Sequence, residues 1–364
     1  MGGFSYLHDS VLAQVIAAAQ MFDKHVYVTQ MTSRVNRTAE GLISLSRNVA
    51  GYPGRKNLLW MSTAFPLNVN PFAASDLASH DDYSELVQKM NRALSDANVA
   101  VYPIDLGGVQ TLSDFQASAR PPDASPDGIR GAIQHNVEQL NSQRDVMEKI
   151  AEGTGGRVCA GDNDLADCIQ KAMDDSSEFY EISYYPNSGN WNGAYRRIFL
   201  KSRVHGARLA YRNWYLATGE EDPDPRVQQT KLQGDCDDYL DATAIPFTAR
   251  ALPAETPDHL KFSVLIDPAA LAFVAAGEGG RSAMLNIAVC TLNEKRWPMK
   301  IMSYPVRLSL TSPQYDAMVA SGGVKQAITV PGPKPAAVRL LVKDITTGKL
   351  GSILIRTDTS AFAN

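Results

Sequence analysis

Small polar side chains follow two apolar segments of this 364-residue chain. Ser62 and Thr63 come directly after the run Leu58 to Met61, and Asp105 ends the run 99–104. Apolar runs without polar alternation are typical of parallel strands that are covered on both faces. Ligand sites in open α/β sheets lie at the carboxyl ends of the strands. We therefore expect Ser62, Thr63 and Asp105 to line a ligand-binding edge.

Each of these residues also has a purely structural interpretation. Asp105 can cap the loop that follows it, and Ser62 and Thr63 can form hydrogen bonds within a turn. The sequence contains no Gly-x-Ser-x-Gly nucleophile elbow, no histidine pair at i, i+4 and no Gly-Lys-Ser/Thr phosphate loop. These patterns favour a binding protein over an enzyme. A hydrolase that uses the same sheet edge is the alternative.

The four cysteines are Cys159, Cys168, Cys236 and Cys290, and they show neither a CxxC pair nor metal-ligand spacing. Cys159 ends a predicted strand, and Cys168 lies nine positions later in the next predicted helix. The two residues form either a short disulfide or two half-buried free thiols. A disulfide would indicate an oxidising compartment.

The composition narrows the class of protein. The chain is 44% hydrophobic and 20% charged, with a net charge of −4, and it is long enough for two domains. Acidic and basic residues are interspersed, so no basic stripe indicates nucleic acid. No apolar run approaches the roughly 18 residues that a transmembrane helix needs. The N-terminal residues do not show the pattern of a signal peptide.

Residues 1–217 read as an α/β domain, in which helical and strand patterns alternate. Arg55 and Lys56 are expected at the solvated entry to the strand at 57–62. Loops are expected at 65–80 and 106–128. The predicted helices cover 9–22, 38–49, 82–96, 133–152 and 162–177, and the predicted strands cover 25–29, 57–62, 99–105, 157–159, 178–186, 196–203 and 209–214.

An acidic segment rich in Pro and Gly begins at Thr218 and predicts a linker over 218–233. Residues 234–364 then read as an immunoglobulin-like β-sandwich domain, because short strand patterns recur without long helices. A short helix is expected at 235–242. The predicted strands cover 245–251, 260–266, 284–292, 305–310, 325–330, 337–344 and 351–355.

Three segments, 53–62, 101–105 and 151–157, together resemble the later half of the von Willebrand factor type A-related domains of acidobacterial proteins. The resemblance covers roughly residues 30 to 215. It implies a doubly wound, mostly parallel sheet that lacks the N-terminal part of the domain. The missing first strand would leave the remaining sheet with an exposed edge, unless residues 9–29 fill it or the chain is a fragment of a longer protein.

The resemblance also implies a divalent-metal site. Thr38 fits the family's Thr before a middle helix, but a helix N-cap is the favoured interpretation of this residue. The family's Asp-x-Ser-x-Ser motif is absent before Thr38. The family also has an Asp directly after the next strand, and this chain has Ser62-Thr63-Ala64 at that position. Mg²⁺ prefers carboxylate ligands, so we expect no cofactor.

The combined reading is a truncated type A-like α/β domain followed by an all-β sandwich. It predicts a non-enzymatic protein-interaction or adhesion protein with a degenerate metal-dependent adhesion site. A protein is the expected partner. The family resemblance implies an extracytoplasmic or secreted location in a bacterium.

Overall fold

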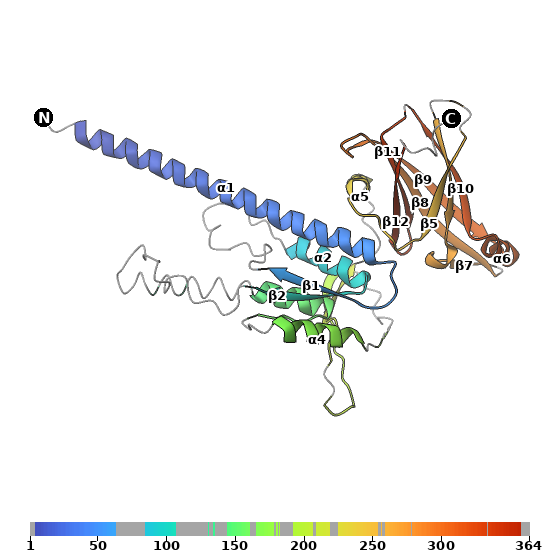
Figure 1. Ribbon diagram of the computed structural model, residues 1–364, viewed down its shortest axis with the longest axis horizontal. Helices are drawn as coiled ribbons and strands as arrows, with labels where there is room; N and C mark the ends of the chain where they lie inside the picture. The colour runs from blue at the N-terminus through green and yellow to red at the C-terminus, as the bar shows by residue number, and fades with distance from the viewer. Residues whose placement is uncertain are drawn as a thin grey trace.

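The computed structural model describes most of the chain, with gaps. The described residues are 4–62, 84–106, 130, 134, 144–160, 165–177, 180, 182, 192–206, 209–218, 225–253, 256, 259–277, 279–332 and 334–357. Thr63, the predicted loop at 65–80 and nearly all of the predicted loop at 106–128 lie outside them. Figure 1 shows a long helix, a small α/β part and a C-terminal β part.

One helix, α1 (Phe4–Val49), replaces the helix, strand and helix predicted for this segment. The predicted strand at 25–29 is wrong. Its β-branched and aromatic residues lower helix propensity by less than about 1 kcal/mol each, and a helix that has formed on both sides propagates through them cooperatively. The Thr29 hydroxyl donates a hydrogen bond to the His25 carbonyl, 2.9 Å away and one turn earlier.

Two parallel strands, β1 (Lys56–Ser62) and β2 (Val99–Asp105), form the centre of the α/β part. The helix α2 (Ser84–Asp96), the end of α1 and a helix whose described part covers 144–154 pack on one face of these strands. The helix α4 (Leu165–Ser177) packs on the other face. Buried residues of the first face include Val35, Ala39, Met90, Leu94, Val101 and Ile150.

The predicted doubly wound, mostly parallel sheet is wrong. Among the described residues, the parallel ladder consists of β1 and β2, with an isolated parallel bridge between Ile104 and Cys159. The largest described sheet has five strands, is antiparallel, and lies in the C-terminal part. Of the strand predicted at 157–159, Cys159 forms an isolated bridge to Ile104, and the segment is not an assigned strand.

Between α4 and the C-terminal part, the described residues contain one antiparallel pair of strands. The strands β3 (Asn192–Arg197) and β4 (Trp214–Thr218) pair with each other, each displaced from the strand predicted nearby. Of the strand predicted at 178–186, only residues 180 and 182 are described, and neither is in a strand.

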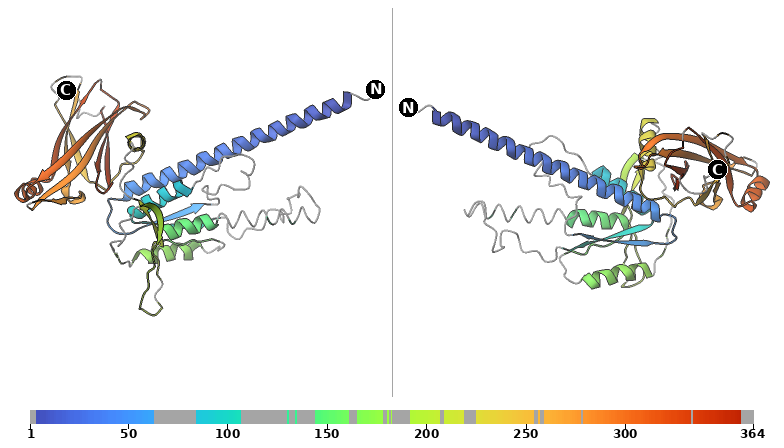
Figure 2. Two further views of the ribbon diagram at one scale, coloured as in Figure 1. Left: turned by 180° about the vertical axis from the view of Figure 1, so that it is seen from behind. Right: turned by 45° about the horizontal axis from the view of Figure 1, so that its top comes forward.

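The helix α5 (Pro225–Asp237) begins inside the predicted linker and ends earlier than the helix expected at 235–242. Its first residue is a proline, which suits the first turn of a helix because that N–H has no intrahelical partner. The helix lies against the outer face of the five-stranded sheet, where Leu232 packs on Leu292 and Leu341 in one apolar cluster. Figure 2 shows α5 between α1 and the β part.

Two antiparallel sheets form the C-terminal part. One has the order β10-β6-β5, and the other joins β12, β11, β8 and β7, with β9 pairing β8. Buried residues from both sheets, among them Phe262, Val264, Leu285, Val289 and Leu340, form one apolar core between them. The strands are β5 (Phe247–Leu252), β6 (His259–Ile266), β7 (Val274–Ala276), β8 (Gly280–Leu292), β9 (Pro298–Leu310), β10 (Val324–Pro331), β11 (Ala337–Asp344) and β12 (Leu350–Arg356), with short helices η2 (Pro268–Ala270) and α6 (Ser312–Ala320).

Candidate functional site

The parallel strands bring two of the sequence-predicted site residues together. Ser62 and Asp105 are register partners at the carboxyl ends of β1 and β2. The Ser62 carbonyl accepts a hydrogen bond from the Leu106 amide at 2.9 Å, and the Asp105 amide donates one to the Cys159 carbonyl at 2.8 Å. One hydroxyl and one carboxyl group therefore share this edge of the ladder.

Thr38 belongs to a different element. It lies in the interior of α1 rather than at the start of a helix, so the N-cap interpretation is wrong. Its hydroxyl donates a hydrogen bond to the Arg34 carbonyl at 2.8 Å, within the same helix. Thr63 lies outside the described residues.

The residues at this edge do not fit the metal site that the type A resemblance implies. Mg²⁺ takes near-octahedral oxygen ligands and depends on carboxylates, and Asp105 supplies the one carboxylate of the predicted set. Elsewhere in the described ranges, no three His, Cys, Asp or Glu side chains are grouped as a metal ion would need.

The outer edge of β1 is the second feature of this region. The backbone amide of Lys56 donates a hydrogen bond to the Asn98 carbonyl, and the Ser62 carbonyl accepts one from the Leu106 amide. The backbone N–H and C=O groups of the even-numbered residues of β1 therefore point toward β2. The backbone N–H and C=O groups of Asn57, Leu59 and Met61 therefore face away from β2. Within the described part of the chain, β2 is the only strand that pairs with β1.

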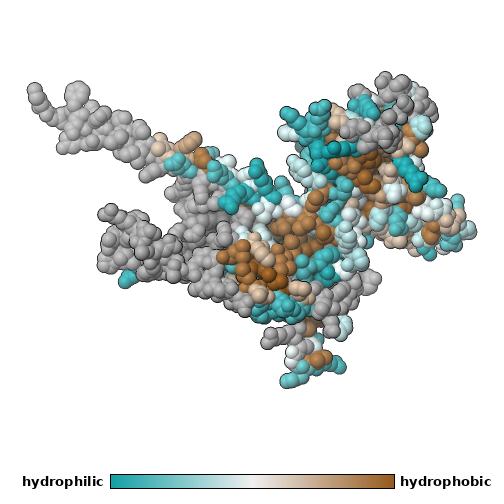
Figure 3. Space-filling view, viewed as in Figure 1, coloured by the Kyte–Doolittle hydropathy of each residue, from teal (hydrophilic) through white to brown (hydrophobic). Residues whose placement is uncertain are grey.

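Both faces of β1 are apolar, as in a strand from the middle of a sheet. Leu58 and Trp60 pack against the cluster formed with α1 and α2, whereas Leu59 packs against Ala172 of α4 on the opposite face. Yet β1 is only half-buried, and Met61 is 46% exposed. In the space-filling view, apolar residues gather over this part of the molecule (Figure 3).

A series of polar contacts joins α4 to the two parallel strands. The Arg55 guanidinium donates to the Tyr102 hydroxyl at 3.1 Å and to the Gly155 carbonyl at 2.7 Å. The Tyr102 hydroxyl donates to Asp175 at 3.0 Å, and Arg157 binds the other oxygen of Asp175 at 2.8 Å. Arg55 is thus a structural residue, contrary to its expected place at a solvated strand entry.

Burial raises the pKa of the Tyr102 hydroxyl above its usual value, and the Arg55 guanidinium opposes that shift. Tyr102 is therefore protonated at neutral pH and donates its hydrogen to Asp175. Arg157 pairs with the Asp175 carboxylate, and Arg55 is joined to the same carboxylate through the Tyr102 hydroxyl, which gives this cluster a structural role.

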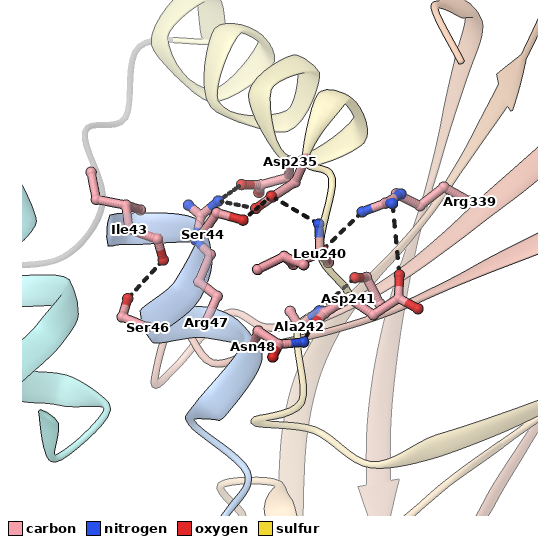
Figure 4. A network of polar contacts seen from close by, with 12 residues as sticks. Ile43, Ser44, Ser46, Arg47, Asn48, Asp235, Leu240, Asp241, Ala242 and Arg339 are labelled. Atoms are coloured by element: carbon pink, nitrogen blue, oxygen red, sulfur yellow. Dashed lines mark hydrogen bonds and ion pairs between the residues drawn. The ribbon is translucent and has the colours of Figure 1, made fainter. Parts of the chain in front are cut away.

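The C-terminal end of α1 is joined to the β part by a polar network, shown in Figure 4. Ser44 and Arg47 of α1 both contact Asp238, and Arg47 also binds Asp235 at 2.9 Å. The Asn48 amide donates to the Asp241 carbonyl at 2.9 Å. These contacts cross nearly 200 positions of the chain, so they fix the α1 terminus against the segment that follows α5.

Arg339 forms the far side of this network. Its side chain is 1% exposed, donates to the Leu240 carbonyl at 3.1 Å and lies 3.7 Å from an Asp241 carboxyl oxygen. Burial lowers the pKa of the Arg339 guanidinium, and the carboxylates of Asp241 and Asp238 oppose the shift. An arginine inside the apolar pattern of 337–342 is the one sequence signal that could have indicated this role.

Two disulfides connect the four cysteines. Cys159 is bonded to Cys168, with a Cα–Cα distance of 6.1 Å, and this bond ties the bridging segment to α4. Cys236 is bonded to Cys290, with a Cα–Cα distance of 5.9 Å, and this bond ties α5 to β8. The second pair could not be inferred from sequence, because 54 positions separate its members. Among the described residues, no helix has both the length and the apolar character that crossing a membrane requires.

Comparisons with known proteins give little. No protein-family model and no curated protein matches the chain. Three chains of solved structures match. One is the hypothetical protein PH1083 from Pyrococcus horikoshii OT3, with 9% identity and a TM-score of 0.19, covering 30% of this chain and 86% of that one. Another is the sensor domain of the anti-sigma factor RsgI4 from Pseudobacteroides cellulosolvens, with 15% identity and a TM-score of 0.17, covering 30% and 95%. TM-scores this low support no argument about fold or function.

Proposed function

We propose that this chain is a non-enzymatic protein-binding protein, and that it binds an extended segment of a partner along the outer edge of β1. The observation that carries the proposal is the set of outward-facing backbone groups at Asn57, Leu59 and Met61. A strand edge with unpaired N–H and C=O groups is a template for another strand. Several peptide-binding domains bind their ligands by adding a strand in this way.

The side chains beside this edge indicate the chemistry of the partner. A strand added next to β1 would continue the apolar faces that Leu58 and Trp60 form on one side and Leu59 on the other. The partner segment is therefore extended, apolar on both faces and uncharged at its centre. Three residues of β1 offer up to six hydrogen bonds, each worth about 0.5–1.5 kcal/mol net.

Residues 9–29 do not fill this edge, because they belong to α1. The relation to type A domains remains part of the proposal, supported by the parallel pair and its covering helices. The extracytoplasmic or secreted location in a bacterium is also proposed. Two disulfides support it, since disulfides persist in oxidising compartments and are rare in reducing ones.

Selection from a displayed library of random peptides, followed by titration and hydrogen exchange, tests the proposal. We expect the selected peptides to be apolar and extended, and to slow amide exchange at Leu59 and Met61. The variant Met61→Pro removes one outward-facing N–H and leaves the bonds to β2 intact. It should weaken peptide binding about tenfold, because one hydrogen bond and its geometry are worth roughly 1.4 kcal/mol.

The matched control is Met61→Ala, which shortens the same side chain but keeps the N–H, and which should bind within about threefold of the unaltered protein. Circular dichroism of both variants checks that the fold is retained. Peptides that bind equally well to Met61→Pro, or that protect amides elsewhere, would overturn the proposal. A library that yields no binder would overturn it as well.

A further inference from the structure

A hairpin arm projects from the α/β part beyond the paired strands β3 and β4 (Figure 1 and the left view of Figure 2). Its described residues are 198–206 and 209–213. The Ile198 amide continues the pairing of the two strands by donating to the Asn213 carbonyl at 2.7 Å. The Leu200 amide donates to the Tyr211 hydroxyl at 3.2 Å. These contacts hold the arm at its base.

The arm exposes large apolar side chains. Phe199 is 78% exposed, Val204 is 72% exposed and Leu209 is 43% exposed. Figure 3 shows apolar residues next to hydrophilic ones at the end of the arm. Exposed apolar groups that are rimmed by polar residues mark sites of contact with a protein or a membrane. The arm therefore has the character of a contact site.

The sequence around the arm is basic, in contrast to the rest of the chain, where acidic and basic residues are interspersed. The 38 residues between Glu181 and Glu220 contain six Lys or Arg and no Asp or Glu, whereas the remaining chain has 29 Lys or Arg against 39 Asp or Glu. Arg197, Lys201 and Arg203 are exposed, and in the described part of the chain none of them belongs to an ion pair. Their charges are available to an anionic surface.

The placement of the apolar residues favours a lipid surface over a protein or a nucleic acid. Phe199 and Leu200 follow directly on the paired residue Ile198, and consecutive side chains of an extended strand point to opposite sides. One flat protein surface would cover one side of the arm, whereas lipid headgroups surround an arm that enters them. Nucleic-acid bases stack on planar side chains, but three of the four exposed apolar residues of the arm are aliphatic.

We infer that the arm binds the surface of a membrane that contains anionic lipids. Phe199 and Val204 enter the boundary between headgroups and acyl chains, and Lys201 and Arg203 lie at the level of the lipid phosphates. Each basic residue near such a surface strengthens binding about fivefold. The contact uses no residue of β1, so it goes beyond the strand edge proposed above and does not depend on it.

Sedimentation of the full chain with lipid vesicles tests the inference. We expect binding to mixed vesicles of phosphatidylglycerol and phosphatidylcholine, no binding to phosphatidylcholine alone, and loss of most binding in about 1 M salt, which screens charges beyond about 3 Å. The double variant Lys201→Gln, Arg203→Gln should weaken binding about 25-fold. The matched control Arg307→Gln, Lys325→Gln removes two exposed charges from the β part and should bind within about twofold of the unaltered chain.

The apolar contribution is tested separately. Phe199→Ser should weaken binding to the anionic vesicles by at least about tenfold, because the vesicles then cover less apolar surface. Phe22→Ser makes the same change at a phenylalanine of α1 that is 68% exposed, and should bind like the unaltered chain. Circular dichroism checks that each variant is folded.

A fluorescent label then reports whether the arm enters the lipid. All four cysteines form disulfides, so a Val204→Cys variant offers one thiol to an environment-sensitive dye. We expect the dye's emission to move to shorter wavelengths with the anionic vesicles. Equal binding to the two kinds of vesicle, equal effects of Phe199→Ser and Phe22→Ser, or an unshifted dye would each overturn the inference.

Titration with a DNA oligonucleotide and with polyglutamate separates a lipid surface from other polyanions. We expect both to bind more weakly than the anionic vesicles, because neither covers the apolar residues of the arm. Binding of either as tightly as the vesicles, with no effect of Phe199→Ser, would overturn the inference and assign the arm to a nucleic acid or an acidic protein.

Discussion

Thr243 holds the C-terminal end of α1 and gives the sharpest test of how the two parts of the chain are joined. Its hydroxyl donates to the Asn48 carbonyl at 2.7 Å and accepts from the Gly51 amide at 2.8 Å. Its amide also donates to the Arg47 carbonyl at 3.1 Å. The last carbonyl groups of a helix lack intrahelical donors. Here Thr243, a residue distant in sequence, donates hydrogen bonds to two of them.

The variant Thr243→Val keeps the side-chain volume and removes both hydroxyl hydrogen bonds. Each such bond contributes about 0.5–1.5 kcal/mol net, so the free energy of unfolding should fall by about 1–3 kcal/mol. The site is half-buried, so water can reach part of the released groups, and we expect a value near 1.5 kcal/mol. The backbone hydrogen bond to Arg47 remains.

Urea denaturation followed by circular dichroism measures the change, and hydrogen exchange of the Gly51 amide shows where it occurs. Thr248→Val, at an exposed position of β5, is the control and should change stability by less than about 0.5 kcal/mol. Equal stabilities of the two variants, together with an unchanged exchange rate at Gly51, would refute the role of Thr243 as the partner of the α1 terminus.

Three further predictions concern the disulfides, the glycines and pH. Replacing both cysteines of Cys236–Cys290 by alanine should lower the free energy of unfolding by about 4 kcal/mol, and the same change at Cys159–Cys168 by about 2.5 kcal/mol. The difference arises because the loop-closure entropy grows with the sequence separation, which is 54 for the first pair and 9 for the second. Guanidinium denaturation measures both values, and a reversed order would contradict the reasoning. Gly156→Ala would place its Cβ 1.8 Å from the Val101 carbonyl oxygen and should destabilise by more than about 2 kcal/mol, whereas Gly41→Ala, with open space around it on α1, should stabilise by about 0.5–1 kcal/mol in the same urea assay. The pKa of Tyr102 is raised in the folded state, so its contribution to stability is complete below the unfolded pKa of about 10 and is lost as the pH rises beyond that value. Thermal unfolding between pH 8 and 11 should therefore show a steeper fall in the unfolding temperature for the unaltered chain than for Tyr102→Phe.

Several strands could be predicted from sequence because their patterns are local. The runs at 57–62 and 99–105 match β1 and β2 almost residue for residue, and the run at 337–344 matches β11. In each case the apolar run is bounded by polar or turn-forming residues, which limits where the strand can end. The long helix was divided wrongly, because residues 25–29 have strand propensity but lie between strongly helical segments.

The candidate site was predictable only in part. Ser62 and Asp105 were expected at one edge, and their register confirms that they meet there. Their role in binding stays a prediction. The missing first strand predicted an exposed sheet edge without saying which strand would carry it, and the structure shows that residues 9–29 are helix and that β2 is the only described partner of β1.

The sequence by itself determined local features: which runs are apolar on both faces and which polar residues follow the strands. Only the tertiary structure decided how these elements combine. It showed that the parallel ladder of the described ranges is a pair with one further bridge, that Cys236 is bonded to Cys290, and that Arg339 is buried at the junction with α1. The physical reason is range. Periodicity and turn chemistry act over a few residues, whereas these contacts join segments that lie from about 50 to nearly 200 positions apart.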